Sequence, residues 1–179
     1  MLRPLFDAHL DLAWSGLFFN RDLTLEVREM RQRERGMSDE RARGHNTLSL
    51  PELRRAGVRV CVATLLARGG PEQTPQPTYK RTDLDYVNPT HANAIAHAQL
   101  AYYRSLEQQG HVKMLRTRGE LSAHWQLAQR DPAAPLGLIL SMEGADPIVM
   151  PEQVQDWWEL GLRAVGPAVA HKPDPDRPL

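Results

Sequence analysis

Cysteine is almost absent from this chain of 179 residues, which contains a single one, Cys61. One thiol cannot form a disulfide framework within the chain, and it cannot supply the several thiolates of a cysteine-based zinc site. An excess of charge of one sign is also missing, because 22 Lys and Arg residues balance 22 Asp and Glu residues. A balanced chain lacks the cationic field that attracts nucleic acids and anionic membranes. We therefore expect neither as a general partner.

Long hydrophobic runs and glycine-rich fingerprints are absent too. No apolar run approaches the ~18 residues of a membrane-spanning helix, and residues 1–7 contain no apolar segment typical of a signal peptide. We therefore expect a cytoplasmic protein with no membrane span. No Gly-x-Gly-x-x-Gly follows the first expected strand, and no Gly-x-x-x-x-Gly-Lys-Ser/Thr occurs. A Rossmann dinucleotide site and a P-loop therefore have no support.

What the chain does contain is an alternation of expected strands and helices. Apolar stretches predict strands over residues 5–10, 58–66, 111–115, 136–142 and 162–168. Helical patterns cover residues 50–57, 90–109, 118–129 and 151–160. Several of the strands are apolar on both faces, which predicts parallel β/α units around a buried sheet. An open doubly wound sheet and a (β/α)8 barrel both begin this way, so both remain open at this point.

Residues 21–44 form a segment crowded with charges of both signs and poor in apolar residues. Mixed charge favours a solvated helix or loop over a surface for nucleic acid. We expect this segment to lie in water.

The strongest chemical signal is Asp7-Ala8-His9-Leu10-Asp11, at the end of the first expected strand. Alternation of apolar and polar residues predicts that Asp7, His9 and Asp11 share one face. An imidazole and a carboxylate two positions apart can bind one metal ion, and Asp7, deeper on that face, could orient a ligand from the second layer. The alternative is a polar strand end with a hydrogen-bonded histidine.

The second signal is Glu143, which follows the apolar residues 136–142 directly and precedes Gly144. A carboxylate in this position is costly to bury unless something pairs with it, and a metal ion would do so. In a parallel sheet it would emerge at the same edge as His9 and Asp11. The alternative is a glutamate exposed to water.

The other candidate side chains have weaker signals. Cys61 lies between two valines of an expected strand, which indicates a packing position rather than a nucleophile. Five histidines lack partners at useful spacing and are expected at the surface or at helix ends: His45, His91, His97, His111 and His124.

Three features in this order resemble the membrane (renal-type) dipeptidase family of zinc peptidases. They are Asp-x-His-x-Asp at the end of the first strand, an apolar strand ending in Glu-Gly, and a helix followed by Gly-Leu-Arg-x-Val. The likeness covers about residues 5–168, including the helix-to-strand passage at 50–66. It implies an α/β fold: an incomplete (β/α)8 TIM-type barrel of the amidohydrolase-like, metal-dependent hydrolase type, with about five of its eight strands.

The resemblance also implies a site with two zinc ions. His9 and Asp11 would bind one ion, and Glu143, the catalytic residue of the set, would bridge both, with Asp7 behind them. A metal-bound hydroxide would then hydrolyse a small dipeptide substrate. The family takes two further histidine ligands from later strands. The resemblance assigns no substrate-binding residue here and leaves a homo-oligomer open.

The resemblance implies two parts of unequal size. Residues 1–168 are expected to be the N-terminal part of a dipeptidase-like barrel, and residues 169–179 a divergent, proline-rich and disordered tail. His171 lies in that tail and receives no ligand role. We expect an N-terminal fragment with weak or no turnover alone. Two alternatives remain: another amidohydrolase-type hydrolase, acting on a lactone or cyclic amide, and a non-catalytic relic or binding module.

Overall fold

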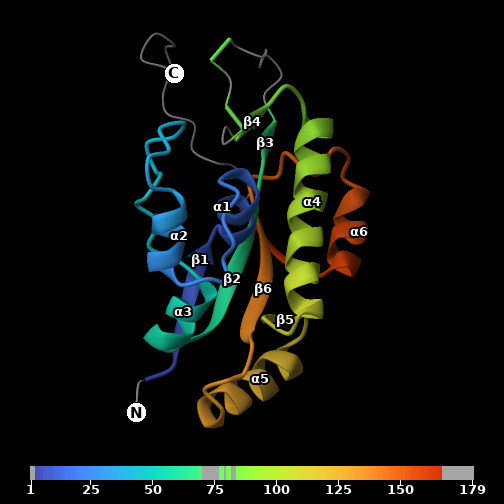
Figure 1. The fold of residues 1–179 in the computed structure, drawn as a ribbon. Coiled ribbons are helices and arrows are strands. Elements are labelled where there is room, and N and C mark those ends of the chain that lie inside the picture. The colour runs from blue at the N-terminus through green and yellow to red at the C-terminus, as the bar shows by residue number, and fades with distance from the viewer. Residues whose placement is uncertain (1–2, 70–76, 79, 82–83, 167–179) are drawn as a thin grey trace, which may run out of the picture.

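A parallel sheet of five strands organises the chain in a computed structural model, which describes residues 3–69, 77–78, 80–81 and 84–166. The strand order is β1-β2-β6-β5, and β7 also pairs with β6 (Figure 1). The strands are β1 (Leu5–Leu10), β2 (Val58–Leu66), β5 (Val112–Met114), β6 (Leu136–Glu143) and β7 (Leu162–Gly166). The expected sheet is confirmed, and over the described residues it does not close into a barrel. A second sheet, which the sequence did not indicate, pairs β3 (Arg68–Gly69) with β4 (Asp85–Tyr86).

Six helices connect the strands over the described residues. They are α1 (Leu12–Phe18), α2 (Val27–Arg33), α3 (Leu50–Ala56), α4 (Pro89–Gln108), α5 (Arg118–Arg130) and α6 (Gln153–Leu160). The four helices expected from the sequence are α3, α4, α5 and α6, and all four are confirmed. Helices α3 and α6 end at Gly57 and Gly161, whose φ angles of 87° and 115° explain why glycine is needed there. Helix α1 was not expected.

Strands β2 and β6 form the centre of the sheet. Val60–Leu66 pairs with Gly137–Glu143 without interruption, so side chains alternate between two faces in both strands together. One face, which includes Cys61, is fully buried in the main core with Tyr103 of α4 and Trp157 of α6. Figure 1 shows α4 and α6 running beside the sheet. The expected packing role of Cys61 is confirmed.

Helix α5 lies at the end of the sheet where β5 and β6 begin (Figure 1). Its His124 is buried and packs on Gly137, where a Cβ atom would lie 2.7 Å from Cδ2 of the imidazole. Burial lowers the pKa of His124. The expectation that His124 lies at the surface or at a helix end is therefore wrong, because the missing side chain at Gly137 makes room for the ring.

The charged segment at 21–44 is only partly solvated. Its Glu34 is buried, and the side-chain oxygen Oε1 lies 2.7 Å from Nε of Arg21 and 3.0 Å from Nη1 of Arg43. Burial alone would raise the pKa of Glu34, but hydrogen bonds from Arg21, from the Gly44 N–H and from Arg43 outweigh it and hold the pKa at about 2. The expectation of a wholly solvated segment is corrected by this buried ionic cluster.

Some sequence expectations fall outside the described residues. The predicted tail at 169–179, with His171, lies there, so the division of the chain at residue 168 stays a prediction. None of the helices in the described ranges combines the length and apolar character that crossing a membrane requires.

The buried ionic cluster generates a prediction about stability. Because the pKa of Glu34 is depressed from 4.5 to about 2, its charge stabilises the fold above pH 4.5, and this contribution is lost as the pH falls toward 2. We expect Glu34→Gln to lower the free energy of unfolding by up to about 3 kcal/mol at pH 7. The difference from the unaltered chain should shrink between pH 4.5 and pH 2.5, as measured by urea denaturation.

A matched control is Glu29→Gln, which removes an exposed carboxylate 2.7 Å from Arg33 on α2. Exposed pairs contribute little to stability, so this variant should unfold almost like the unaltered chain at every pH. Equal losses in the two variants would contradict the role of the cluster.

Candidate metal centre

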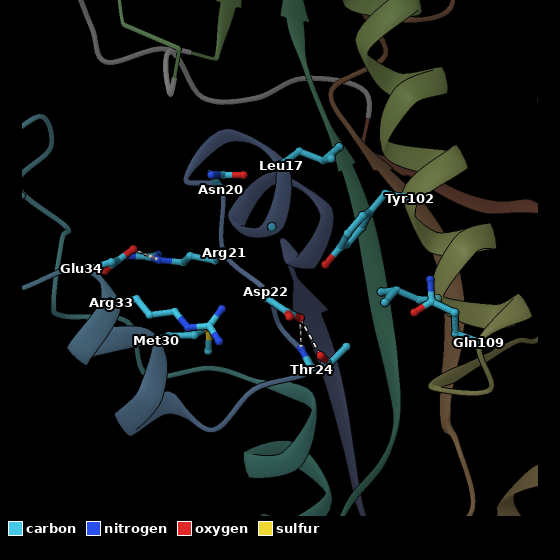
Figure 2. A pocket seen from close by; sticks show the side chains of 12 residues that line it. Leu17, Asn20, Arg21, Asp22, Thr24, Met30, Arg33, Glu34, Tyr102 and Gln109 are labelled. Atoms are coloured by element: carbon cyan, nitrogen blue, oxygen red, sulfur yellow. Dashed lines mark hydrogen bonds and ion pairs between the residues drawn. The ribbon is translucent and has the colours of Figure 1, made fainter.

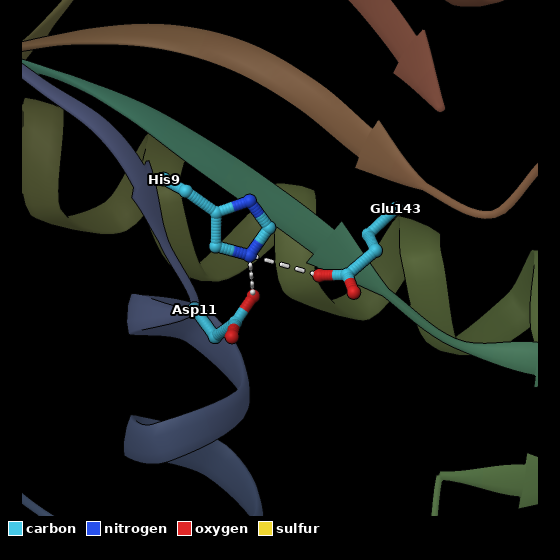
Figure 3. Close-up of side chains that lie close together, drawn as sticks. All are labelled: His9, Asp11 and Glu143. Atoms are coloured by element: carbon cyan, nitrogen blue, oxygen red, sulfur yellow. Dashed lines mark ion pairs between the residues drawn. The ribbon is translucent and has the colours of Figure 1, made fainter. Parts of the chain in front are cut away.

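Three side chains meet at the carboxyl edge of the sheet: His9, Asp11 and Glu143 (Figure 3). The Nε2 atom of His9 lies 2.9 Å from Oε2 of Glu143 and 3.4 Å from Oδ1 of Asp11. One ligand atom from each residue lies within 4.8 Å of the other two. The structure therefore brings together the three residues that the sequence singled out from two separate strands.

Strand order explains why these residues meet. His9 belongs to β1 and Glu143 to β6, and β2 lies between them. Two strand spacings amount to roughly 9–10 Å, a gap that the histidine and glutamate side chains can bridge from opposite sides. Asp11 follows the end of β1 and begins α1. The site therefore spans the end of β2 without taking a ligand atom from that strand.

The donor atoms suit a divalent cation. Imidazole nitrogen and carboxylate oxygen are ordinary ligands of zinc, and two carboxylates balance the charge of one dication. Oε2 of Glu143 is buried and accepts no hydrogen bond of acceptable geometry, although it faces His9. A buried carboxylate oxygen without a donor is costly, and a cation among the three donors would satisfy it. The residues present therefore fit a metal ion.

The centre is open to solvent on its histidine side. The side chain of His9 is 54% exposed, whereas those of Asp11 and Glu143 are 30% and 31% exposed. A ligand can therefore approach over the imidazole while the two carboxylates stay partly shielded. This asymmetry leaves room at the centre for a further group.

Asp7 has a different position from the one expected. Asp7 pairs with Cys61, and the next pair is Leu10 with Ala63. Between these two pairs β1 advances by three residues and β2 by only two. This extra residue breaks the alternation, so Asp7 pairs with Cys61 and does not share a face with His9. Its Oδ1 instead accepts a hydrogen bond of 3.0 Å from the backbone N–H of His9. The expectation of one shared face is wrong, and a supporting role for Asp7 stays a prediction.

Cys61 is not among the residues that converge at this centre. Burial raises the pKa of its thiol to about 12, and the charge of Asp7 acts in the same direction. The side chain of Cys61 is fully buried in the main core, and Cys61 is not one of the three residues whose ligand atoms come together. The donor set of the centre therefore consists of nitrogen and oxygen.

Sequence reasoning missed the residues that support Asp11. Thr64 of β2 donates a hydrogen bond from its hydroxyl to Oδ1 of Asp11. Tyr103 of α4 contacts both the backbone of Thr64 and the start of α1. Neither residue belongs to a motif, and no spacing in the sequence connects positions 11, 64 and 103.

A separate pocket of about 560 Å³ lies between α1, α2 and α4 (Figure 2). Its lining includes Arg21 and Glu34, whose charges are paired with each other. None of the three donors of the metal centre lines it. This pocket is therefore distinct from the centre.

Comparison with known proteins identifies the fold. No family model and no curated protein sequence matches the chain. Solved structures do: dipeptidase AC, a metallopeptidase of family M19, superposes with a TM-score of 0.57 at 22% identity, over 93% of this chain and 43% of that one. The chain has the fold of M19 dipeptidases over part of their length.

Two further structures agree. The probable dipeptidase PvdM from Pseudomonas aeruginosa gives a TM-score of 0.60 at 15% identity, over 94% of this chain and 35% of its own. A metallopeptidase from Rhodobacter sphaeroides, bound to a phosphinate mimic of the dipeptide L-Ala-D-Ala, gives 0.57 at 20% identity, over 93% and 46%. The chain thus spans less than half the length of these dipeptidases, and its open sheet corresponds to part of their TIM-barrel-like fold.

The geometry of the centre predicts binding of a divalent cation. We expect Zn²⁺ to stabilise the chain, by about 2.7 kcal/mol at a free concentration 100 times the Kd. His9→Ala and Glu143→Ala each remove one of the three donors and should abolish most of this gain. Thermal unfolding with and without Zn²⁺ measures the effect.

The control is His91→Ala, which removes an exposed histidine from the start of α4. Zn²⁺ should stabilise this variant as much as the unaltered chain. If all three variants lost the stabilisation equally, the ion would be binding elsewhere.

Proposed function

We propose that this chain provides part of the active site of a zinc-dependent dipeptidase. The observation that carries the proposal is the convergence of His9, Asp11 and Glu143 at the carboxyl edge of a sheet with the fold of M19 dipeptidases. In parallel barrels, chemistry takes place at this edge of the strands. The centre therefore has both the donors and the position that metal-assisted hydrolysis requires.

Each residue would have a distinct task. His9 would offer Nε2 to the ion, Asp11 would offer Oδ1, and Glu143 would offer Oε2 from the far side of β2. A second oxygen on Glu143 would let this carboxylate bridge to a second ion. Bound zinc supplies Lewis acidity toward a carbonyl and lowers the pKa of a coordinated water. A small substrate would approach the centre from the solvent side, where His9 is exposed.

The proposed substrate is a dipeptide. Support comes from the related folds, one of which is bound to a phosphinate mimic of L-Ala-D-Ala. The alternative, hydrolysis of a lactone or cyclic amide, uses the same metal chemistry. Assays with a panel of dipeptides and lactones distinguish the two substrate classes. We further propose a cytoplasmic location, which rests on the sequence alone.

Enzyme assays test the proposal. The zinc-loaded chain should hydrolyse L-Ala-D-Ala slowly, below the ordinary kcat range of about 1–10³ s⁻¹, because the described residues supply only three metal ligands. Glu143→Ala should lower the rate at least about 100-fold through loss of the metal. The release of free alanine measures turnover.

Two controls make the assay decisive. His91→Ala, which leaves all three donors in place, should retain the rate of the unaltered chain, and removal of zinc by a chelator should abolish it. Hydrolysis that survives both chelation and Glu143→Ala would overturn the proposal. Faster hydrolysis of a lactone than of any dipeptide would favour the alternative substrate.

A further inference from the structure

Asp11 occupies the N-cap position of α1, yet its side chain makes no capping hydrogen bond. Aspartate is one of the best N-cap residues because its carboxylate accepts hydrogen bonds from the first free N–H groups of a helix. The N-cap side chains of α3, α4 and α5 all do this: Ser49, Asn88 and Thr117. Asp11 shares the absence of a side-chain cap with Glu26 of α2 and Glu152 of α6, but at α1 another side chain supplies the acceptor.

Tyr103 takes over that role from a distant part of the chain. Its phenol oxygen accepts a hydrogen bond of 3.1 Å from the N–H of Ala13, in the first turn of α1. The same hydroxyl donates a hydrogen bond of 2.9 Å to the carbonyl oxygen of Thr64. Tyr103 and Ala13 are both fully buried, so neither group can turn to water instead. Burial also raises the pKa of Tyr103, so the phenol keeps its proton.

Thr64 forms a hydrogen bond with the carboxylate of Asp11, which does not cap α1. Its hydroxyl donates a hydrogen bond to Oδ1 of Asp11, the same oxygen that faces Nε2 of His9 at 3.4 Å. The side chain of Thr64 is almost fully buried, at 1% exposure. Its β-branched side chain has few rotamers, which fixes the position of the hydroxyl oxygen beside Asp11; the carbonyl oxygen of Leu10, at 3.3 Å, is a second acceptor of the same hydroxyl. The carboxylate of Asp11 is thereby directed toward the metal centre rather than toward its own helix.

We propose that Thr64 and Tyr103 are positioning residues of the metal centre, which together keep the carboxylate of Asp11 from capping α1 and direct it toward His9. The role of Thr64 in this inference rests on the proposed zinc site, whereas the capping role of Tyr103 concerns the metal-free chain. Tyr103 caps α1 in place of Asp11, and Thr64 orients the freed carboxylate. Groups that orient metal ligands in this way commonly change metal affinity by about 10–100-fold when removed.

Hydrogen exchange on the metal-free chain tests the capping half. Tyr103→Phe should accelerate exchange of the Ala13 amide at least about 10-fold relative to amides of α5, whereas Asp11→Ala should leave it unchanged. The opposite pattern, with Ala13 deprotected by Asp11→Ala and not by Tyr103→Phe, would overturn the inference. This arm requires no zinc.

Zinc affinity tests the orienting half. Thr64→Val should weaken zinc binding about 10–100-fold, and Thr64→Ser, which restores the hydroxyl, should recover most of it. Cys61→Ala, a change at a buried position of the same strand, controls for lost stability and should keep the affinity. Isothermal titration measures each Kd.

The outcomes separate the two proposals. If the unaltered chain binds zinc and Thr64→Val binds it equally tightly, the proposed function stands and the positioning role falls. If the unaltered chain binds no zinc, the proposed function falls together with the orienting role. A loss of affinity in Cys61→Ala as large as in Thr64→Val would show that stability alone explains the effect, which also overturns the positioning role.

Discussion

Parallel pairing of β2 with both β1 and β6 is the constraint on which the candidate site depends. Because all three strands run the same way, their carboxyl ends reach one edge of the sheet. The uninterrupted register of β2 with β6 places Glu143 beside Leu66, the last residue of β2. The pairing of Leu10 with Ala63 fixes where β1 ends. A slip of one residue in either pair would move a ligand to the opposite face. The candidate metal centre therefore depends on the register of the strands as well as on the chemistry of its side chains.

The environment of the centre combines rigidity on one side with access on the other. On the buried side of Asp11 lie Thr64 and Tyr103, both almost completely buried. The hydroxyl of Tyr103 donates a hydrogen bond to the carbonyl oxygen of Thr64. In front of Asp11, His9 is largely exposed. A buried support with an exposed ligand is the arrangement expected of a group that must hold an ion and admit a substrate. The ionic cluster of Glu34 differs from the centre, because the side chains of Arg21, Glu34 and Arg43 are all at most 9% exposed.

The sequence was most informative where periodicity and short-range chemistry coincide. The apolar runs of β2 and β6 predicted these strands closely, because the signal lies within each strand. His9, Asp11 and Glu143 were recognisable because each stands at the end of a predicted strand. The face of Asp7 was not predictable, since the irregularity in β1 depends on its pairing with β2. His124, Glu34 and Tyr103 escaped for the same reason: their burial depends on partners far away in the sequence.

The proposed zinc site consists of His9, Asp11 and Glu143. An anomalous difference map from crystals of the zinc-loaded chain, measured at the zinc absorption edge, locates the bound ion. We expect a peak within about 2.0–2.2 Å of Nε2 of His9 and of one carboxylate oxygen each of Asp11 and Glu143. An anomalous peak at another histidine, with none among these three residues, would contradict the proposed site.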